Sequence, residues 1–270
     1  MSDASSLLWH YSPSLALCLI ALVLFALSAL WHISQLFKYR QKFFFIFVLG
    51  TLCQVVGYIG RLGCIHNLEN LTYYIVQSLA VLLAPIFYAA SIYSLLGKIV
   101  QYAGAESLSP IRPTRITFIF VIGDLLSFLM QSTGGGMMAS GDASKMDLGT
   151  NIILIGLIIQ LVFFFFFIFL TCVFHVRTSD WQVKGHQGHW KLLLKILEVS
   201  SALIFIRSVY RVVEYAQGFY GYFISHEVYL YVLDALLMLI VQLLFSFVHP
   251  GTVLYTQKPR ITKDIEMSLI

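Results

Sequence analysis

Three ionisable residues with helical spacing occur in the otherwise apolar stretch RSVYRVVEYAQG, residues 207–218. Arg207, Arg211 and Glu214 stand at positions i, i+4 and i+7, so one face of a helix would carry all three. Charged groups inside a hydrocarbon layer cost about 2.5–3.5 kcal/mol each on insertion scales, and they normally pair or face a water-filled cavity. The chemistry open to this face is therefore the binding of a polar headgroup or ion pairing with a neighbouring helix.

Other apolar stretches carry polar stripes at the same helical spacing, within residues 43–63, 115–138 and 226–248. Because residues with this spacing share one helix face, the simplest arrangement is a bundle in which the stripes converge. We predict that the stripes form a polar site that binds substrate. The predicted substrate-binding residues are Arg61, Asp124, Gln131, Arg207, Tyr210, Arg211, Glu214, His226, Glu227, Tyr231 and Asp234.

The depth of each charge in its helix predicts which residues pair. Counting 1.5 Å per residue from the expected helix ends places Arg211 about 10 Å and Asp234 about 12 Å below the same surface. These similar depths predict an Arg211–Asp234 ion pair. Arg207 and Asp124 both fall near the midplane, about 15 Å from a surface, which predicts a second pair between them. Such pairs have two interpretations that the spacing leaves open, since they can lock a bundle together or line a wet cavity.

The elements that must position these residues are membrane-spanning helices. The 270 residues are 59% hydrophobic and 11% charged, whereas a soluble domain is about 25% charged. Seven apolar runs reach the roughly 20 residues that cross a bilayer. They fall at about 14–36, 43–63, 72–97, 115–138, 148–174, 195–217 and 226–248. We predict an all-α polytopic membrane protein, in which residues 1–270 form a single seven-helix transmembrane domain that ends in a tail at 249–270.

The basic residues predict the orientation of this bundle. Thirteen of the 17 Lys and Arg fall on one side, in the loops after the first, third and fifth runs and in the tail, and only Lys145 falls on the other side. Since cytoplasmic loops are enriched in Lys and Arg, we expect the N-terminus outside and the C-terminus in the cytoplasm. The first run is too long for a cleavable signal peptide, so it should act as a signal anchor. Asn70-Leu71-Thr72 fits the glycosylation pattern in a loop expected outside, although it lies almost at the membrane.

Motifs for nucleotide hydrolysis and metal catalysis are missing from the sequence. No G-x-x-x-x-G-K-[ST] stretch occurs, and the pair His226-Glu227 is followed by Leu230 where a zincin would have its second His. His186 and His189 form either a weak metal site or part of a solvated loop. The four cysteines show no metal or disulfide spacing. We therefore expect no enzymatic activity, no cofactor and no nucleic-acid partner.

Three further patterns have more than one interpretation. Gly134-Gly135-Gly136 is typical of a flexible helix end or a close helix contact. The run Phe163–Phe167 favours lipid-facing or packing surface over a ligand box. The tyrosines around 210–231 fit an interfacial aromatic belt and a binding site equally well.

Several stretches together resemble one fungal family, the "resistance to aminocholesterol" proteins, also called lipid-translocating exporters. The most specific are RSVYRVVEYAQG (207–218) and SHEVYLYVLDALLMLIVQLLFSFVHPG (225–251). LLAPIFYAASIYSLLGKIV (82–100), FVIGDLLSFLMQSTGGGMMAS (120–140) and GLIIQLVFFFFF (156–167) also match, and GYIGR (57–61) matches more loosely. The resemblance implies seven spans, an external N-terminus, and movement of sphingoid bases, sterol-like amines or porphyrins across a fungal membrane in drug and stress resistance. It supplies no residue roles.

Our first hypothesis is an exporter of amphipathic lipids, which include sphingoid bases, phospholipids and sterol-like amines. It would act in the plasma membrane, with the endoplasmic reticulum or vacuole as alternatives, and contribute to lipid asymmetry. In this hypothesis Asp234, Glu214 and Glu227 bind a cationic amine, while Arg207 and Arg211 pair with them at rest or bind a phosphate. The alternative is a seven-span receptor or sensor that alters lipid asymmetry indirectly, and a zinc-dependent lipid amidase is a third, weaker hypothesis. The substrate, energy source and oligomeric state are left open by the sequence.

Overall fold

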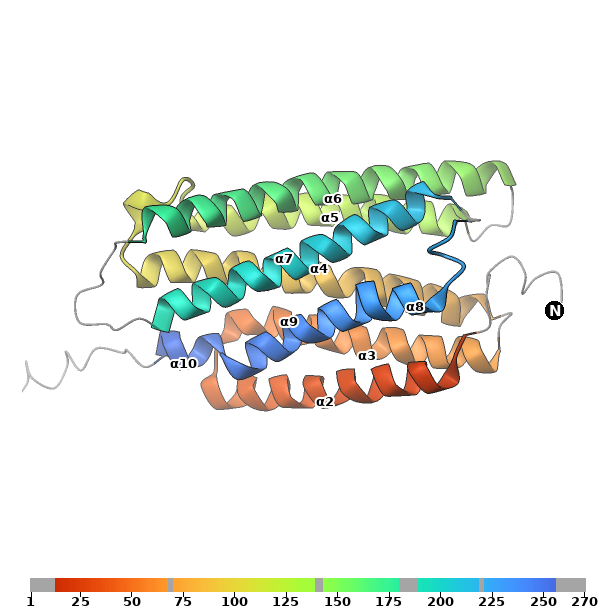
Figure 1. Cartoon of the computed structure of the whole chain (residues 1–270), viewed down its shortest axis with the longest axis horizontal. Coiled ribbons are helices and arrows are strands. Elements are labelled where there is room, and N and C mark those ends of the chain that lie inside the picture. Colours follow the sequence, from red (N-terminus) through yellow and green to blue (C-terminus); the bar gives the residue numbers. More distant parts are fainter. Residues whose placement is uncertain (1–12, 68–69, 139–142, 180–188, 219–220, 256–270) are drawn as a thin grey trace, which may run out of the picture.

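The computed structural model describes residues 13–67, 70–138, 143–179, 189–218 and 221–255, and these residues form an all-helical bundle. Long helices lie side by side and run alternately up and down (Figure 1). Six of them, in chain order, are α2 (Leu15–Tyr39), α3 (Phe45–His66), α4 (Leu71–Tyr102), α5 (Pro113–Met138), α6 (Ala143–Arg177) and α7 (His189–Ala216). The last long element is composite, and consists of α8 (Glu227–Leu230), the π-helical turn η3 (Tyr231–Ala235) and α9 (Leu236–Phe247).

Short elements complete the described chain. The 3₁₀ turns η1 (Lys42–Phe44) and η2 (Glu106–Leu108) lie in connections, and α10 (Pro250–Tyr255) follows α9. We call the end of the bundle where α2, α4, α6 and α8 begin the N-terminal end, and the end with α10 the C-terminal end (Figure 1). The tail expected from residue 249 therefore begins as a helix that packs against α7, α2 and α4, while residues 256–270 lie outside the described residues.

Within the described residues, six helical segments are long and apolar enough to cross a membrane. They are Leu15–Tyr39, Lys42–His66, Leu71–Tyr102, Arg115–Met138, Ser144–Arg177 and Glu227–Leu254. Helix α7 is as long as these but carries charges throughout, from Lys191 to Glu214, so its composition alone does not mark it as a span. The predicted runs agree with the helices to within a few residues at most ends, and a seventh crossing through α7 stays a prediction.

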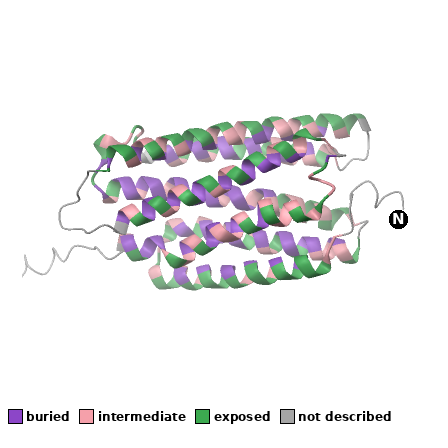
Figure 2. Cartoon of the chain, viewed as in Figure 1, coloured by how far each residue is buried: buried purple, intermediate pink, exposed green. Residues whose placement is uncertain are grey.

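Helix α4 lies at the centre of the bundle. In its most apolar stretch 61% of the residues are buried, against 28% in α6, and the colouring in Figure 2 shows the same contrast. Outer helices turn large apolar side chains outward, such as Leu30 and Phe118, of which 65% and 67% are exposed. This outer surface suits contact with lipid chains. Lipid chains are as apolar as these side chains, so nothing drives the side chains inward.

The phenylalanine run of α6 has both of the roles expected for it. Phe164 and Phe167 are buried and pack against Tyr93 of α4, with ring centroids 6.0 and 4.6 Å away. Phe165 and Phe166 lie on the other face of the helix and are exposed. The run therefore divides by helical periodicity into a packing face and an outward face.

Basic residues gather at the C-terminal end of the bundle. Within the described residues, Lys38, Lys42, Lys98, Arg112, Arg115, Arg177 and Lys191 all lie in or beside the connections at that end, whereas Lys145 lies at the N-terminal end. Because successive helices run in opposite directions, the connections that carry most of the basic residues lie at the same end, as the charge count predicted.

Candidate functional site: a buried charge network beside a cavity

The most buried ion pair joins Arg207 of α7 to Asp234 of η3. Arg207 Nε donates to Asp234 Oδ1 at 2.7 Å, and Nη2 donates to Oδ2 at 3.1 Å. Nη2 also lies 3.3 Å from the carbonyl oxygen of Val81 on α4, to which it donates. A two-point contact between guanidinium and carboxylate is the strongest geometry for such a pair, so this contact ties three helices together at one level.

The predicted pairings were wrong in their partners. Arg207, not Arg211, holds Asp234, and Asp124 forms no ion pair with Arg207. The depth count assumed regular α-helices that run parallel to the membrane normal. In the structure Asp234 lies on a π-helical turn, which inserts one extra residue, and α7 crosses its neighbours at a slant (Figure 1). Because a slanted helix covers less depth per residue, Arg207 lies nearer to the level of Asp234 than the count gave, and Arg211, one turn or about 6 Å away on α7, lies further from it.

The second ion pair lies within α7, nearer the N-terminal end. Arg211 Nη1 lies 2.7 Å from Glu214 Oε2, and Tyr210 donates its hydroxyl to Glu214 Oε1 at 3.1 Å. The Arg211 guanidinium lies 5.1 Å from the ring centroid of Tyr215, whose hydroxyl accepts from Nη2 at 3.5 Å. Arg211 Nε has no hydrogen-bond partner within the described part of the chain. This arginine is thus less completely bonded than Arg207.

The third ion pair lies at the start of the last helix. Arg61 Nη2 of α3 lies 2.6 Å from Glu227 Oε1, and Arg61 Nε donates to the Tyr231 hydroxyl at 3.1 Å. Glu227 Oε2 accepts from the backbone N–H of Ser14 at 2.8 Å, just before α2. The charge network, which we define as Arg61, Arg207, Tyr210, Arg211, Glu214, Glu227, Tyr231 and Asp234, therefore includes eight of the eleven predicted site residues.

The other three predicted residues lie outside this network. Asp124 is 1% exposed and accepts from the Tyr93 hydroxyl at 2.9 Å. Gln131 Nε2 donates to Gln160 Oε1 of α6 at 3.0 Å. His226 is exposed, donates Nδ1–H to the carbonyl of Tyr222 at 2.8 Å, and lies in an aromatic cluster at the N-terminal end.

The described residues form no candidate metal site. Across the described residues, no group of three or more His, Cys, Asp or Glu side chains is placed to hold a metal ion. The possible site at His186 and His189 lies outside the residues whose side chains are described.

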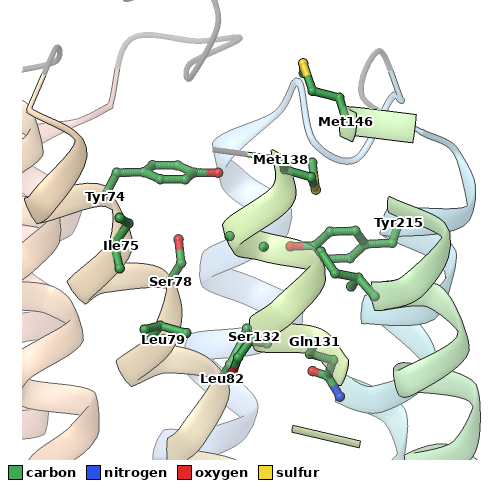
Figure 3. A pocket seen from close by; sticks show the side chains of 13 residues that line it. Tyr74, Ile75, Ser78, Leu79, Leu82, Gln131, Ser132, Met138, Met146 and Tyr215 are labelled. Carbon is green, nitrogen blue, oxygen red and sulfur yellow. The ribbon is translucent and has the colours of Figure 1, made fainter. Parts of the chain in front are cut away.

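A cavity of about 130 Å³ lies beside the charge network, between α4, α5, α6 and α7. Its polar lining consists of Tyr74, Ser78, Gln131, Ser132 and Tyr215, and the remaining side chains are aliphatic or methionine. Figure 3 shows the hydroxyl ends of Tyr74 and Tyr215 pointing into the space from opposite sides. No charged side chain lines it among the described residues. Tyr215 is the link to the charge network, because Arg211 lies over its ring.

The glycine triplet of α5 explains why the cavity exists. A Cβ on Gly134 would lie 2.5 Å from the carbonyl oxygen of Gly149, so Gly134 allows α5 and α6 to touch, as one interpretation of the triplet predicted. Gly135 and Gly136 have no atom within 4 Å of such a Cβ, and both line the cavity. Sequence reasoning found Gln131 and allowed for a wet cavity, but it expected charged residues to line that cavity and missed the glycine triplet as the signal for its place.

Comparisons with known proteins agree with this picture. The sequence pattern of the family described as "RTA1 like protein" matches residues 47–257. Protoporphyrin uptake protein 1 of Saccharomyces cerevisiae is 34% identical over 282 residues, which cover 91% of this chain and 92% of that protein. Protein RTA1 of the same yeast is 34% identical over 90% of this chain and 84% of its own length.

A further yeast relative is named as a transporter. The sphingoid long-chain base transporter RSB1 is 27% identical over 93% of this chain and 75% of its own length. No solved structure matches the chain. Because the family pattern covers most of the sequence and two relatives exceed 30% identity over nine-tenths of it, the chain belongs to the RTA1-like family.

Proposed function

We propose that the protein is a membrane transporter that moves amphipathic, lipid-like compounds such as sphingoid bases or sterol-like amines. The observation that carries this proposal is the cavity between α4, α5, α6 and α7, which combines hydroxyl and amide groups with apolar walls and adjoins a charge network. Ligand sites of this kind are mostly apolar with a few converging polar groups. The names of two relatives, a sphingoid long-chain base transporter and a protoporphyrin uptake protein, support the same class of substrate.

Seven crossings, with the basic C-terminal end in the cytoplasm and the N-terminus outside, form part of this proposal. The pairing of Arg207 with Asp234 and of Arg211 with Glu214 supports a crossing by α7, since paired charges cost less inside a membrane than single ones. Residues 1–270 would then form one transmembrane domain, which we place in the plasma membrane. Asn70 caps α4 by accepting from the Thr72 N–H at 3.0 Å, and its glycosylation stays a prediction.

The arrangement suggests how a headgroup would be recognised. All three carboxylates of the charge network already hold an arginine, so a cationic amine would have to take a carboxylate from its partner. Glu214 is the best placed of the three for this exchange. Its partner Arg211 contacts the cavity residue Tyr215, and the Nε–H of Arg211 has no hydrogen-bond partner in the described part of the chain. Asp234 is held at two points by Arg207 and is the least available.

Transport by the purified protein in liposomes tests the proposal. Labelled long-chain base, phospholipid and sterol-like amine are offered to vesicles that contain the wild type, Gly135→Leu or Thr133→Leu. Leucine at Gly135 fills the cavity from open space and favours the helix over glycine, so we expect at least a tenfold slower movement without loss of folding. Thr133 is exposed on the other face of α5, and its variant is expected to match the wild type.

The same experiment separates the transporter from the receptor. A transporter moves lipid without other proteins, whereas a receptor that acts on lipid asymmetry indirectly moves none of the panel. If the wild type moves none of the three probes, the transporter proposal is wrong. If Gly135→Leu transports as fast as the wild type, the cavity is not the binding site.

A further inference from the structure

Asp124 differs from the three carboxylates of the charge network in having no cationic partner in the described part of the chain. Asp234, Glu214 and Glu227 each hold an arginine at 2.6–2.7 Å. Asp124 is as deeply buried, but its contact is the Tyr93 hydroxyl at Oδ2, and its Oδ1 has no hydrogen-bond partner in the described part of the chain. A carboxyl group in this setting lacks the compensation that the other three receive.

The ionisable groups on the helices packed against α5 do not supply that compensation. On α4, Tyr93 is the group in contact, while Tyr88 is bonded to Gln242 and Lys98 lies over the ring of Phe43. On α6, the residue at the level of Asp124 is Phe163, which lies against Gly123, the residue before Asp124. The nearest ionisable side chain along α6 in the C-terminal direction is Cys172, nine residues or about 13 Å away.

Asp124 lies deep within the bundle. It lies eleven residues into the 26-residue α5, close to the middle of the helix. A lone carboxylate buried at such a depth is costly unless a cation or several hydrogen bonds compensate it. Charging Asp124 would therefore require water or a rearrangement of the helices around it.

A polar stripe connects this carboxyl group to the cavity. Ser127 and Gln131 follow Asp124 at i+3 and i+7 on α5, and they are 0% and 2% exposed. Gln131 lines the cavity, about 10 Å further along the helix. Between the two lies Ser127, whose hydroxyl donates to the carbonyl of Gly123 at 2.9 Å.

We propose that Asp124 is a proton-binding site, and that its protonation drives substrate movement through the cavity; this rests on the proposed transport function. The carboxylic O–H bond breaks when water reaches Asp124 from one side of the membrane, and the proton passes to that water. A proton from water on the opposite side restores the acid, and no other bond changes. Because the charged and uncharged forms favour different packing of α5 against α4, proton binding shifts the population of two bundle conformations.

Two isosteric variants distinguish proton binding from a structural role. Asp124→Asn keeps an acceptor for the Tyr93 hydroxyl but cannot titrate, whereas Tyr93→Phe removes the hydrogen bond and keeps the acid. Wild type and both variants are reconstituted in liposomes with an imposed pH gradient, a labelled long-chain base as probe and a pH-sensitive dye inside. We expect the gradient to raise probe accumulation in the wild type and in Tyr93→Phe at least tenfold above that of protein-free vesicles, which trap the amine by its own protonation, with matching proton movement. Asp124→Asn should give only the protein-free level.

The opposite outcomes are equally informative. A full gradient response in Asp124→Asn overturns the proposal, as does wild-type transport that ignores the gradient, and in both cases the transport function stands. Absence of probe movement in the wild type under all gradients overturns both the coupling and the transport function. A second measurement needs no variant: a hydrophobic carbodiimide, which modifies protonated carboxyl groups, should label Asp124 and not the ion-paired Asp234, and failure to label Asp124 overturns the proposal.

Discussion

The two ends of the bundle solve the same problem, polar groups buried among membrane helices, with different chemistry. At the N-terminal end, Arg207 and Asp234 are partners in a network of three ion pairs. At the C-terminal end the buried polar groups are uncharged amides, hydroxyls and imidazoles. Gln242 of α9 donates to the Tyr88 hydroxyl at 2.7 Å, and His32 Nε2 donates to the Gln242 carbonyl at 3.1 Å.

The surroundings of the two ends differ in the same way. The uncharged network lies among aromatic rings, in which Phe44 stacks on Phe47 with centroids 4.6 Å apart and meets His249 edge to face at 4.7 Å. The charge network adjoins a cavity through Tyr215 and includes a π-helical turn, a feature that is frequent at functional sites. The comparison indicates that the C-terminal end holds the helices together, whereas the N-terminal end combines that role with an adjoining cavity, which we propose as the ligand site.

The largest effect is expected from breaking the Arg207–Asp234 pair. Arg207→Met leaves Asp234 charged, buried and unpaired, which costs about 3–5 kcal/mol of stability. Replacing both residues, as Arg207→Met with Asp234→Leu, removes the uncompensated charge and should restore most of that loss. Unfolding of the purified variants in detergent measures the difference, and a double variant as unstable as the single one would show that the pair does more than neutralise charge.

A smaller effect is expected at the uncharged end. Gln242→Leu leaves the buried Tyr88 hydroxyl without its donor, which costs about 1–3 kcal/mol. The same unfolding measurement applies, with Tyr88→Phe in the Gln242→Leu background as the control that removes the orphaned hydroxyl. A loss equal to that of Arg207→Met would abolish the proposed contrast between the two ends.

The smallest effect is expected at the rim of the charge network. The Glu227 side chain is 11% exposed, so water can partly replace its contacts. Glu227→Gln removes the charge and keeps one acceptor oxygen, so either Arg61 or the Ser14 N–H loses its acceptor at this partly exposed site, and we expect a loss of about 1 kcal/mol. A loss as large as that of Arg207→Met would place Glu227 among the fully buried pairs.

Much of the fold follows from the sequence because a membrane restricts the choices. Backbone polar groups must be satisfied within each segment, so every long apolar run has to be a helix, and the runs match the described helices closely. Helical periodicity also selected the right faces, since Arg207, Arg211 and Glu214 are all buried as their spacing required. These properties depend on neighbouring residues along the chain.

Which residues form ion pairs, and where the cavity lies, were decided only by the tertiary structure. Asp234 meets Arg207, one turn of α7 away from the predicted partner Arg211, because α7 lies at a slant to its neighbours, which no spacing within either helix reveals. The cavity depends on Gly134 bringing α5 against α6 while Gly135 and Gly136 leave a gap. One chain segment determines its own helix and its polar face, but a contact or a gap depends on the relative placement of two segments, and that is fixed only when they pack.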